Sequence, residues 1–193
     1  MSRPGLCILL AGFVVRILFL WDISDSPTFL TPIVDASKHR KLAASLLVGE
    51  FPEDLFWRSV FYPLYLYVAF FLTESSILAV KIFQASLGAV TSWFAYRLGE
   101  EHFGSRVGIV AGVLTILCGP LLFWESELVA AGWASFWSLL LIWLILRTAD
   151  RATLLDCLAL GLCSALAVLT RPSFLPFVLL SSIWLCFRFW KRF

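Results

Sequence analysis

The chain has 193 residues, of which 61% are hydrophobic and only 15% are charged, with a formal net charge of +2. Soluble domains have about a quarter of their residues charged, so this composition excludes a water-soluble globular domain and indicates a chain solvated by lipid. The small net charge does not favour nucleic acid as a partner, and we expect membrane lipids instead. We predict one all-α membrane domain over residues 1–193, a polytopic transmembrane helix bundle with amphipathic helices in an external loop.

Membrane-spanning segments are the first feature along the chain. A spanning helix needs about 20 mostly apolar residues. Six segments approach this length: 5–21, 77–96, 107–124, 128–146, 154–170 and 173–187. The first lacks the small-residue cleavage site of a signal peptide, so we interpret it as a retained anchor helix. The run 60–73 has only 14 residues, with Pro63 near its start. This length favours an interfacial or re-entrant helix over a span.

The distribution of Lys and Arg supports six spans with both termini in the cytoplasm. The cytoplasmic pieces are then Arg3, the loops 97–106 and 147–153, and the tail 188–193, and each carries Lys or Arg. If 60–73 were a full span, every later loop would invert and the basic tail would lie outside. We therefore expect a long external loop over 22–76, in a multi-pass protein of a bacterial inner membrane.

The external loop contains the densest polar stretch of the chain, DASKHRKLAASLLVGEF, which begins at Asp35. Asp35 suits the N-cap of an amphipathic helix and Gly49 suits its end. In one interpretation this helix lies on the membrane and its basic residues face lipid headgroups. In the other, the Asp35 carboxylate accepts or orients a proton of an acceptor hydroxyl or amine, while cations hold a lipid phosphate. The candidate cations are Lys38, His39, Arg40, Lys41 and Arg58.

Further charged residues fall near the same predicted membrane face. Glu125 and Glu127 stand at a turn between two apolar segments, and are interpreted either as solvated loop residues or as contacts to an acceptor or metal ion. Arg171 is at the next external turn. Arg16 lies inside the first helix, where it either snorkels outward or pairs with an acid of the bundle.

Several classes of site are not indicated. The five cysteines lie in or beside apolar runs without metal-ligand spacing, and are interpreted as small hydrophobic residues. No nucleotide-binding P-loop, GxSxG elbow or zinc motif occurs. The sequence indicates no particular cofactor. The alternative is a divalent cation held by Asp35 and Glu127.

The order of these features resembles the N-terminal membrane module of GT-C glycosyltransferases, polytopic enzymes that use lipid-phosphate-linked sugars. The segment VDASKHRKLAASLLVGEF is similar to the family's external-loop segment that begins with the catalytic Asp and ends near L-x-x-G. FWRSVFYPLYLYVAF is similar to its F-x-R-x-P-L-Y-P stretch, and GPLLFWESELVAAGWASF to its S-x-E-L-L-x-E region. ALAVLTRPSFLPFVLL resembles its L-T-R-P segment. The family includes protein mannosyltransferases and the aminoarabinose transferase of lipid A.

The resemblance implies a function for matching positions. Asp35 would be the catalytic acid, and the chain would transfer a sugar from a polyprenyl phosphate to an acceptor at the external face, with inversion. The predicted substrate-binding residues are Lys38, Arg58, Tyr62, Glu127 and Arg171.

The chain departs from the family pattern at several positions. Ala131 stands where many relatives have a second acid, Val60 replaces a proline, and His39 replaces an aromatic residue. Relatives also continue through further helices. The alternative function is therefore a non-catalytic membrane subunit, or a remnant of such an enzyme, that binds a lipid phosphate. In that case a second chain supplying further helices is the expected partner.

Overall fold

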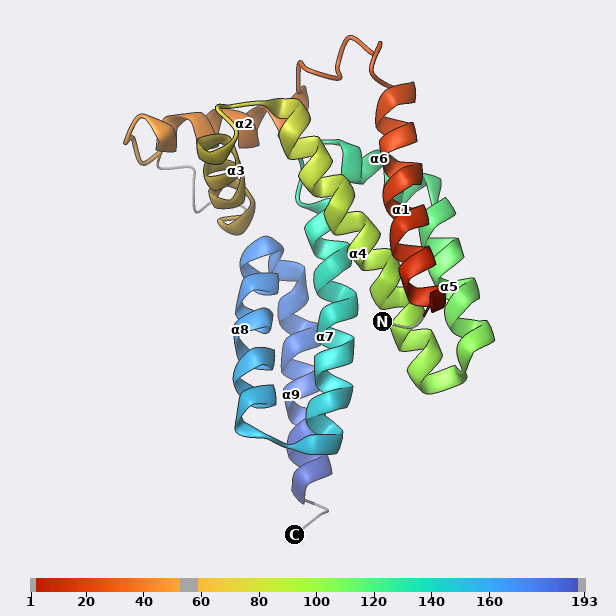
Figure 1. The fold of residues 1–193 in the computed structure, drawn as a ribbon. Coiled ribbons are helices and arrows are strands. Elements are labelled where there is room, and N and C mark those ends of the chain that lie inside the picture. The colour runs from red at the N-terminus through yellow and green to blue at the C-terminus, as the bar shows by residue number, and fades with distance from the viewer. Residues whose placement is uncertain (1–2, 53–58, 191–193) are drawn as a thin grey trace.

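The structure, a computed structural model, describes residues 3–52 and 59–190. Every regular element in this part of the chain is a helix (Figure 1). In chain order the elements are α1 (Arg3–Asp22), α2 (Val34–Leu47), α3 (Phe61–Leu72), α4 (Ile77–Phe103), α5 (Ser105–Leu117), α6 (Gly119–Ser126), α7 (Ala131–Arg151), α8 (Leu154–Thr170), the 3-10 helix η2 (Pro172–Phe174) and α9 (Leu175–Trp190). The predicted all-α fold is confirmed.

Four helical stretches are long and apolar enough to cross a membrane: α1, α4, α7 and the η2–α9 stretch. α5 and α6 together also qualify, but they meet at 53°. This bend replaces the straight span expected over 107–124, because Pro120 lacks the N–H that would continue α5. α8 is apolar but has 17 residues. The six predicted spans therefore correspond to four long helices, one bent pair and one shorter helix.

Two boundaries differ from those expected. α4 continues to Phe103 instead of ending near residue 96, because its last turns are stabilised by Arg97, whose guanidinium contacts Glu100 Oε2 at 2.9 Å and Glu101 Oε1 at 2.5 Å. α7 begins at Ala131 instead of residue 128. Runs of apolar residues indicate where a helix lies in the membrane, but they do not indicate where its polar end or the following extended turn lies.

α4 is the centre of the bundle and packs against α1, α5 and α7. It lies very close to α5, where a Cβ placed on Gly99 would lie 2.7 Å from the Cα of Gly108. Two glycines thus let the backbones of these helices touch, as small residues do in membrane-embedded helix pairs.

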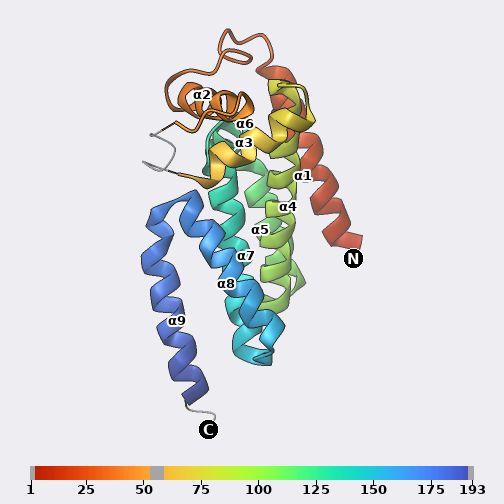
Figure 2. The same cartoon turned by 90° about the vertical axis from the view of Figure 1, so that its left-hand side faces the viewer.

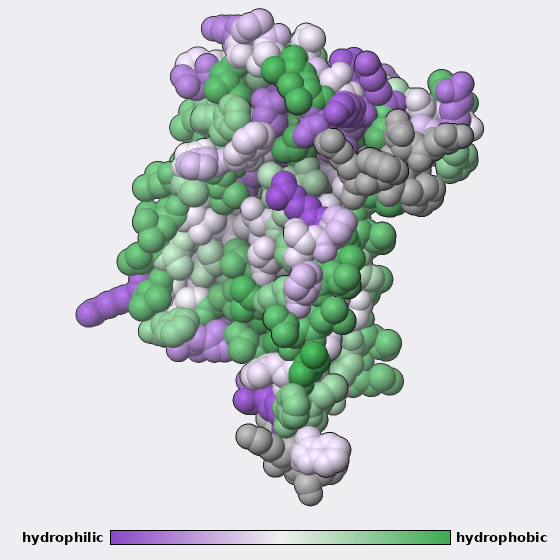
Figure 3. All heavy atoms as spheres, turned by 180° about the vertical axis from the view of Figure 1, so that it is seen from behind, coloured by the Kyte–Doolittle hydropathy of each residue, from purple (hydrophilic) through white to green (hydrophobic). Residues whose placement is uncertain are grey.

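Polar elements gather at one end of the bundle, which we call the α2 end. It consists of α2, α3, α6, the segment 23–33 and the turn between α8 and α9 (Figures 1 and 2). The start of α1, the α4–α5 and α7–α8 turns and the end of α9 point the other way. Hydrophobic side chains cover the middle of the molecule, whereas hydrophilic ones gather at the α2 end (Figure 3). This distribution is that of a multi-pass membrane protein.

α3 fits the expectation for the short run 60–73. With 12 residues it is about 18 Å long, well short of the ~30 Å hydrocarbon core. It packs against α2, where Tyr62 and Leu66 join Ala36 and Ala43 in one core cluster.

The start of α2 differs from the prediction. The N-cap is Ile33, without a side-chain cap, so Asp35 is not the N-cap but a residue of the first helical turn. There its carboxylate still lies near the positive end of the helix dipole. Val34, just before it, has the left-handed φ of 51°, which is strained for a β-branched residue. The helix stops as expected: Gly49 has φ of 82° and its N–H bonds to the carbonyl of Leu46.

Candidate functional site

A buried ion pair joins α1 to α6 beneath the α2 end. Arg16 Nε lies 2.6 Å from Glu125 Oε2, and the two side chains are 3% and 2% exposed. Arg16 Nη1 also donates to the carbonyl of Gly12 at 3.1 Å. Of the two interpretations of Arg16, pairing within the bundle is thus correct and snorkelling is wrong. Glu125 is committed to this pair and is not a solvated loop residue.

Gly88 of α4 makes the ion pair possible. A Cβ at this position would overlap both Arg16 Nε and the Glu125 carboxylate. Only hydrogen leaves room for the two charged groups to meet against the α4 backbone. The sequence showed Gly88 as one small residue among several in α4, so no pattern indicated this role.

A second polar network fixes the turn after α6. Tyr62 Oη donates to Gln84 Oε1 at 2.8 Å, and Gln84 Nε2 donates to the backbone carbonyls of Glu125 and Glu127, both at 2.7 Å. Tyr62 is fully buried, and burial, with Tyr65 and Glu127 nearby, raises the pKa of its phenol well above the ordinary value. It therefore acts as a neutral hydrogen-bond donor that orients the turn carrying Glu127.

Two cavities open at the α2 end. The first, which we call the Arg171 cavity, has a volume of about 570 Å³. Charged or polar groups on its wall include Asp35 and His39 of α2 and Arg171 after α8. Asp35 and His39 are four residues apart, so both face the cavity from one side of α2. The predicted juxtaposition of Asp35 and Arg171, which are 136 positions apart in the sequence, is present in the fold.

The second cavity, the Glu127 cavity, has a volume of about 330 Å³ and lies next to the first. Its wall contains Asp35 and Glu127 together with the aromatic rings of Phe123 and Trp124. Asp35, Trp124 and Val129 belong to both walls. One carboxylate is therefore accessible from a cavity with a cation and from a cavity with a second acid.

The remaining predicted residues are placed differently. Lys38 Nζ lies 3.7 Å from Asp35 Oδ1, with both side chains at least half exposed, so it is a weak surface partner of the carboxylate. Tyr62 lines neither cavity and is fully buried. Arg58 falls outside the described residues. Among the residues that the structure describes, no group of three or more His, Cys, Asp or Glu side chains could hold a metal ion.

Two contacts near the site were not predicted. His39, one of the candidate cations, contacts the Tyr62 ring edge to face at 5.0 Å, and its spacing from Asp35 could have indicated that the two share a helix face. Lys81 is 1% exposed, and its ammonium lies 4.4 Å from the centre of the Phe29 ring. That contact holds the segment 23–33 against α4, and nothing in the local sequence predicts it.

Comparisons with protein-family models, with curated proteins and with solved structures give no match. The class that the fold itself defines is a multi-pass helical membrane protein with a polar, cavity-bearing end. The likeness to GT-C glycosyltransferases rests on the order of its sequence motifs.

Proposed function

We propose that the protein is an integral membrane glycosyltransferase that moves a sugar from a polyprenyl phosphate to an acceptor at the α2 end. The observation that carries the proposal is the place of Asp35 on the common wall of the Arg171 and Glu127 cavities. In a transferase with two substrates, the base that takes the acceptor's proton must lie where the acceptor meets the donor.

The roles follow from the charges. In the proposed reaction Arg171 binds the donor phosphate by charge-assisted hydrogen bonds. Asp35 takes the proton of the acceptor hydroxyl, whose oxygen attacks the anomeric carbon as the bond from that carbon to the phosphate oxygen breaks. The phosphate leaves with the electron pair, its charge offset by Arg171, and the anomeric configuration inverts. Glu127 orients the acceptor. Asp35 and Glu127 are the residues that would hold a divalent cation, which would polarise the acceptor hydroxyl.

The first test concerns the donor site. We expect Arg171→Ala to raise the donor concentration for half-maximal transfer about 10- to 100-fold, the loss of one charged hydrogen-bonding partner. The assay uses the purified chain in phosphatidylcholine vesicles, a polyprenyl-phosphate sugar as donor, and membrane extracts as acceptor. Arg106→Ala, an exposed arginine at the start of α5, is the matched control. Equal effects of both substitutions would contradict the role of Arg171, and no transfer by the wild type would contradict the proposal.

One observation favours a second function, that of a lipid-phosphate-binding subunit. Leu185 is the one buried residue of α9, so this helix has an almost entirely free surface. Helices of a further chain would cover it in a complex. Phosphate-lipid binding without transfer by the isolated chain, and transfer after addition of a partner chain, would distinguish this function from the first.

The proposed orientation puts the α2 end outside a bacterial inner membrane and both termini in the cytoplasm. It is supported by the basic residues Arg97, Arg106, Arg147 and Arg151 at the opposite end of the bundle. Phosphatase reporters fused after Gly49 and after the C-terminus should be active and inactive, respectively. Equal activity at the two sites would contradict the orientation.

A further inference from the structure

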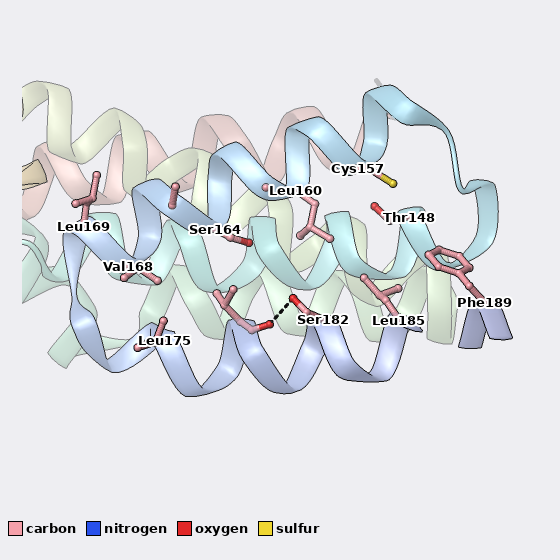
Figure 4. A pocket seen from close by; sticks show the side chains of 13 residues that line it. Thr148, Cys157, Leu160, Ser164, Val168, Leu169, Leu175, Ser182, Leu185 and Phe189 are labelled. Carbon is pink, nitrogen blue, oxygen red and sulfur yellow. Dashed lines mark hydrogen bonds between the residues drawn. The ribbon is translucent and has the colours of Figure 1, made fainter. Parts of the chain in front are cut away.

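An apolar groove separates α8 from α9. α8 packs against α7 and η2, whereas α8 and α9 hardly touch each other although they follow one another in the chain. The groove between them has a volume of about 730 Å³. Side chains of both helices face it, among them Leu160 and Val168 of α8 and Leu175 and Leu185 of α9 (Figure 4).

Polar groups on the groove wall are few, and one of them, the Thr148 hydroxyl, is buried without a hydrogen-bond partner among the described residues. Ser182 Oγ donates to the carbonyl of Val178 at 2.8 Å, the bond drawn in Figure 4. In the membrane such a groove is filled by apolar material, because lipid leaves no gap between two helices.

The groove ends at the turn whose residues line the Arg171 cavity, although the two walls share no residue. Leu169 and Leu175 belong to the groove, whereas three of the five residues between them, Thr170, Arg171 and Pro172, line the Arg171 cavity. An apolar slot and a cationic pocket thus meet at one turn of the chain. A ligand that fills both has an anionic head and a long hydrocarbon chain.

The length of the groove and the cation beside its end favour a lipid chain with an anionic head as the occupant. The groove extends along α8 from Leu169 to Cys157, which is 12 residues or about 18 Å. The length exceeds one leaflet, half of the ~30 Å hydrocarbon core.

We propose that the groove between α8 and α9 binds the prenyl chain of a lipid phosphate whose head lies in the Arg171 cavity. This assignment rests on the proposed function for the identity of the head group. It adds the place of the chain: the lipid enters from the bilayer between α8 and α9, and Gly161 leaves the slot open, since a Cβ there meets no atom within 4 Å.

Cys157 provides a native reporter. It lines the lower part of the groove and is a free, exposed thiol, whereas the exposed Cys186 of α9 lies outside the groove at a similar depth. The full chain in phosphatidylcholine vesicles is treated with N-ethylmaleimide, and modification of each cysteine is followed by mass spectrometry. Undecaprenyl phosphate at about ten times its Kd should slow modification of Cys157 about tenfold, because only one molecule in eleven is free. Modification of Cys186 should not change.

Two variants make the test specific. Gly161→Phe places a ring in the open slot and should remove the protection of Cys157, measured as the ratio of rates with and without lipid. Leu162→Phe, at the adjacent lipid-facing position with 64% exposure, should leave protection intact. Equal protection by undecaprenol, which lacks the phosphate, would overturn the link to the Arg171 cavity. Protection by inorganic phosphate alone would overturn chain binding.

The outcomes also separate this inference from the proposed function. Slow modification of Cys157 before any lipid is added, with two copies cross-linking through it, would show that a second copy covers the groove, and would overturn the inference. Protection of Cys157 without sugar transfer would support the groove and refute the enzyme. Transfer without protection would do the reverse.

Discussion

Replacing Glu125 by Leu is expected to lower the free energy of unfolding by about 3–5 kcal/mol, because it leaves the buried Arg16 guanidinium without its counter-charge. Arg16→Met should have a similar effect through the unpaired carboxylate. The double variant Arg16→Met/Glu125→Leu should recover most of the loss, since a pair of apolar side chains carries no desolvation penalty. Stability is measured by denaturant or thermal unfolding of the purified chain in detergent.

The control for this prediction is an exposed ion pair of the same chemistry. Arg188 Nη2 lies 3.1 Å from Asp150 Oδ1, and the side chains are 41% and 66% exposed. Asp150→Leu should therefore cost no more than about 1 kcal/mol. A double variant at Arg16 and Glu125 that is as unstable as the sum of the single changes would contradict the account of the buried pair.

The second large effect is expected at Asp35. Asp35→Asn keeps the shape of the side chain but removes the base, so transfer should fall about 10²- to 10⁴-fold. Because the side chain is half exposed and its pair with Lys38 is weak, stability should change little. Transfer is measured in vesicles with a polyprenyl-phosphate sugar, and unfolding is measured alongside.

Asp25→Asn is the matched control for Asp35→Asn. Asp25 is an exposed acid of the same predicted external loop and lines neither cavity. It should retain full activity. Full activity of the Asp35→Asn variant would refute the catalytic assignment, and a parallel loss in both variants would point to a general charge effect of the loop.

The sequence allowed the helical class and most helices to be predicted, because runs of apolar residues report directly on burial in lipid. It also allowed Asp35 and Arg171 to be assigned to one end of the bundle, since counting spans determines on which side each turn lies. The bend at Pro120 was missed because the apolar run continues through it. The position of Pro120 inside the apolar run was the one feature of the sequence that could have indicated the bend.

The details of the site depend on contacts between distant segments. Gln84 is one polar residue in an apolar helix, and its two hydrogen bonds to the carbonyls of Glu125 and Glu127 follow from the packing of α4 against the turn after α6. The same holds for Gly88, whose role is defined by two side chains from other helices. Local sequence patterns do not indicate contacts between residues that are far apart in the chain.

The partners of the buried ion pair are 109 positions apart along the chain. At a synthesis rate of about 5–20 residues per second, α1 is complete roughly 5–20 s before the ribosome adds Glu125. During that interval the guanidinium of Arg16 has no Glu125 to meet, and water or headgroups at the membrane surface are the solvents open to it. The contact between α1 and α6 through this ion pair therefore forms late, because Arg16 meets its carboxylate only when α6 is made.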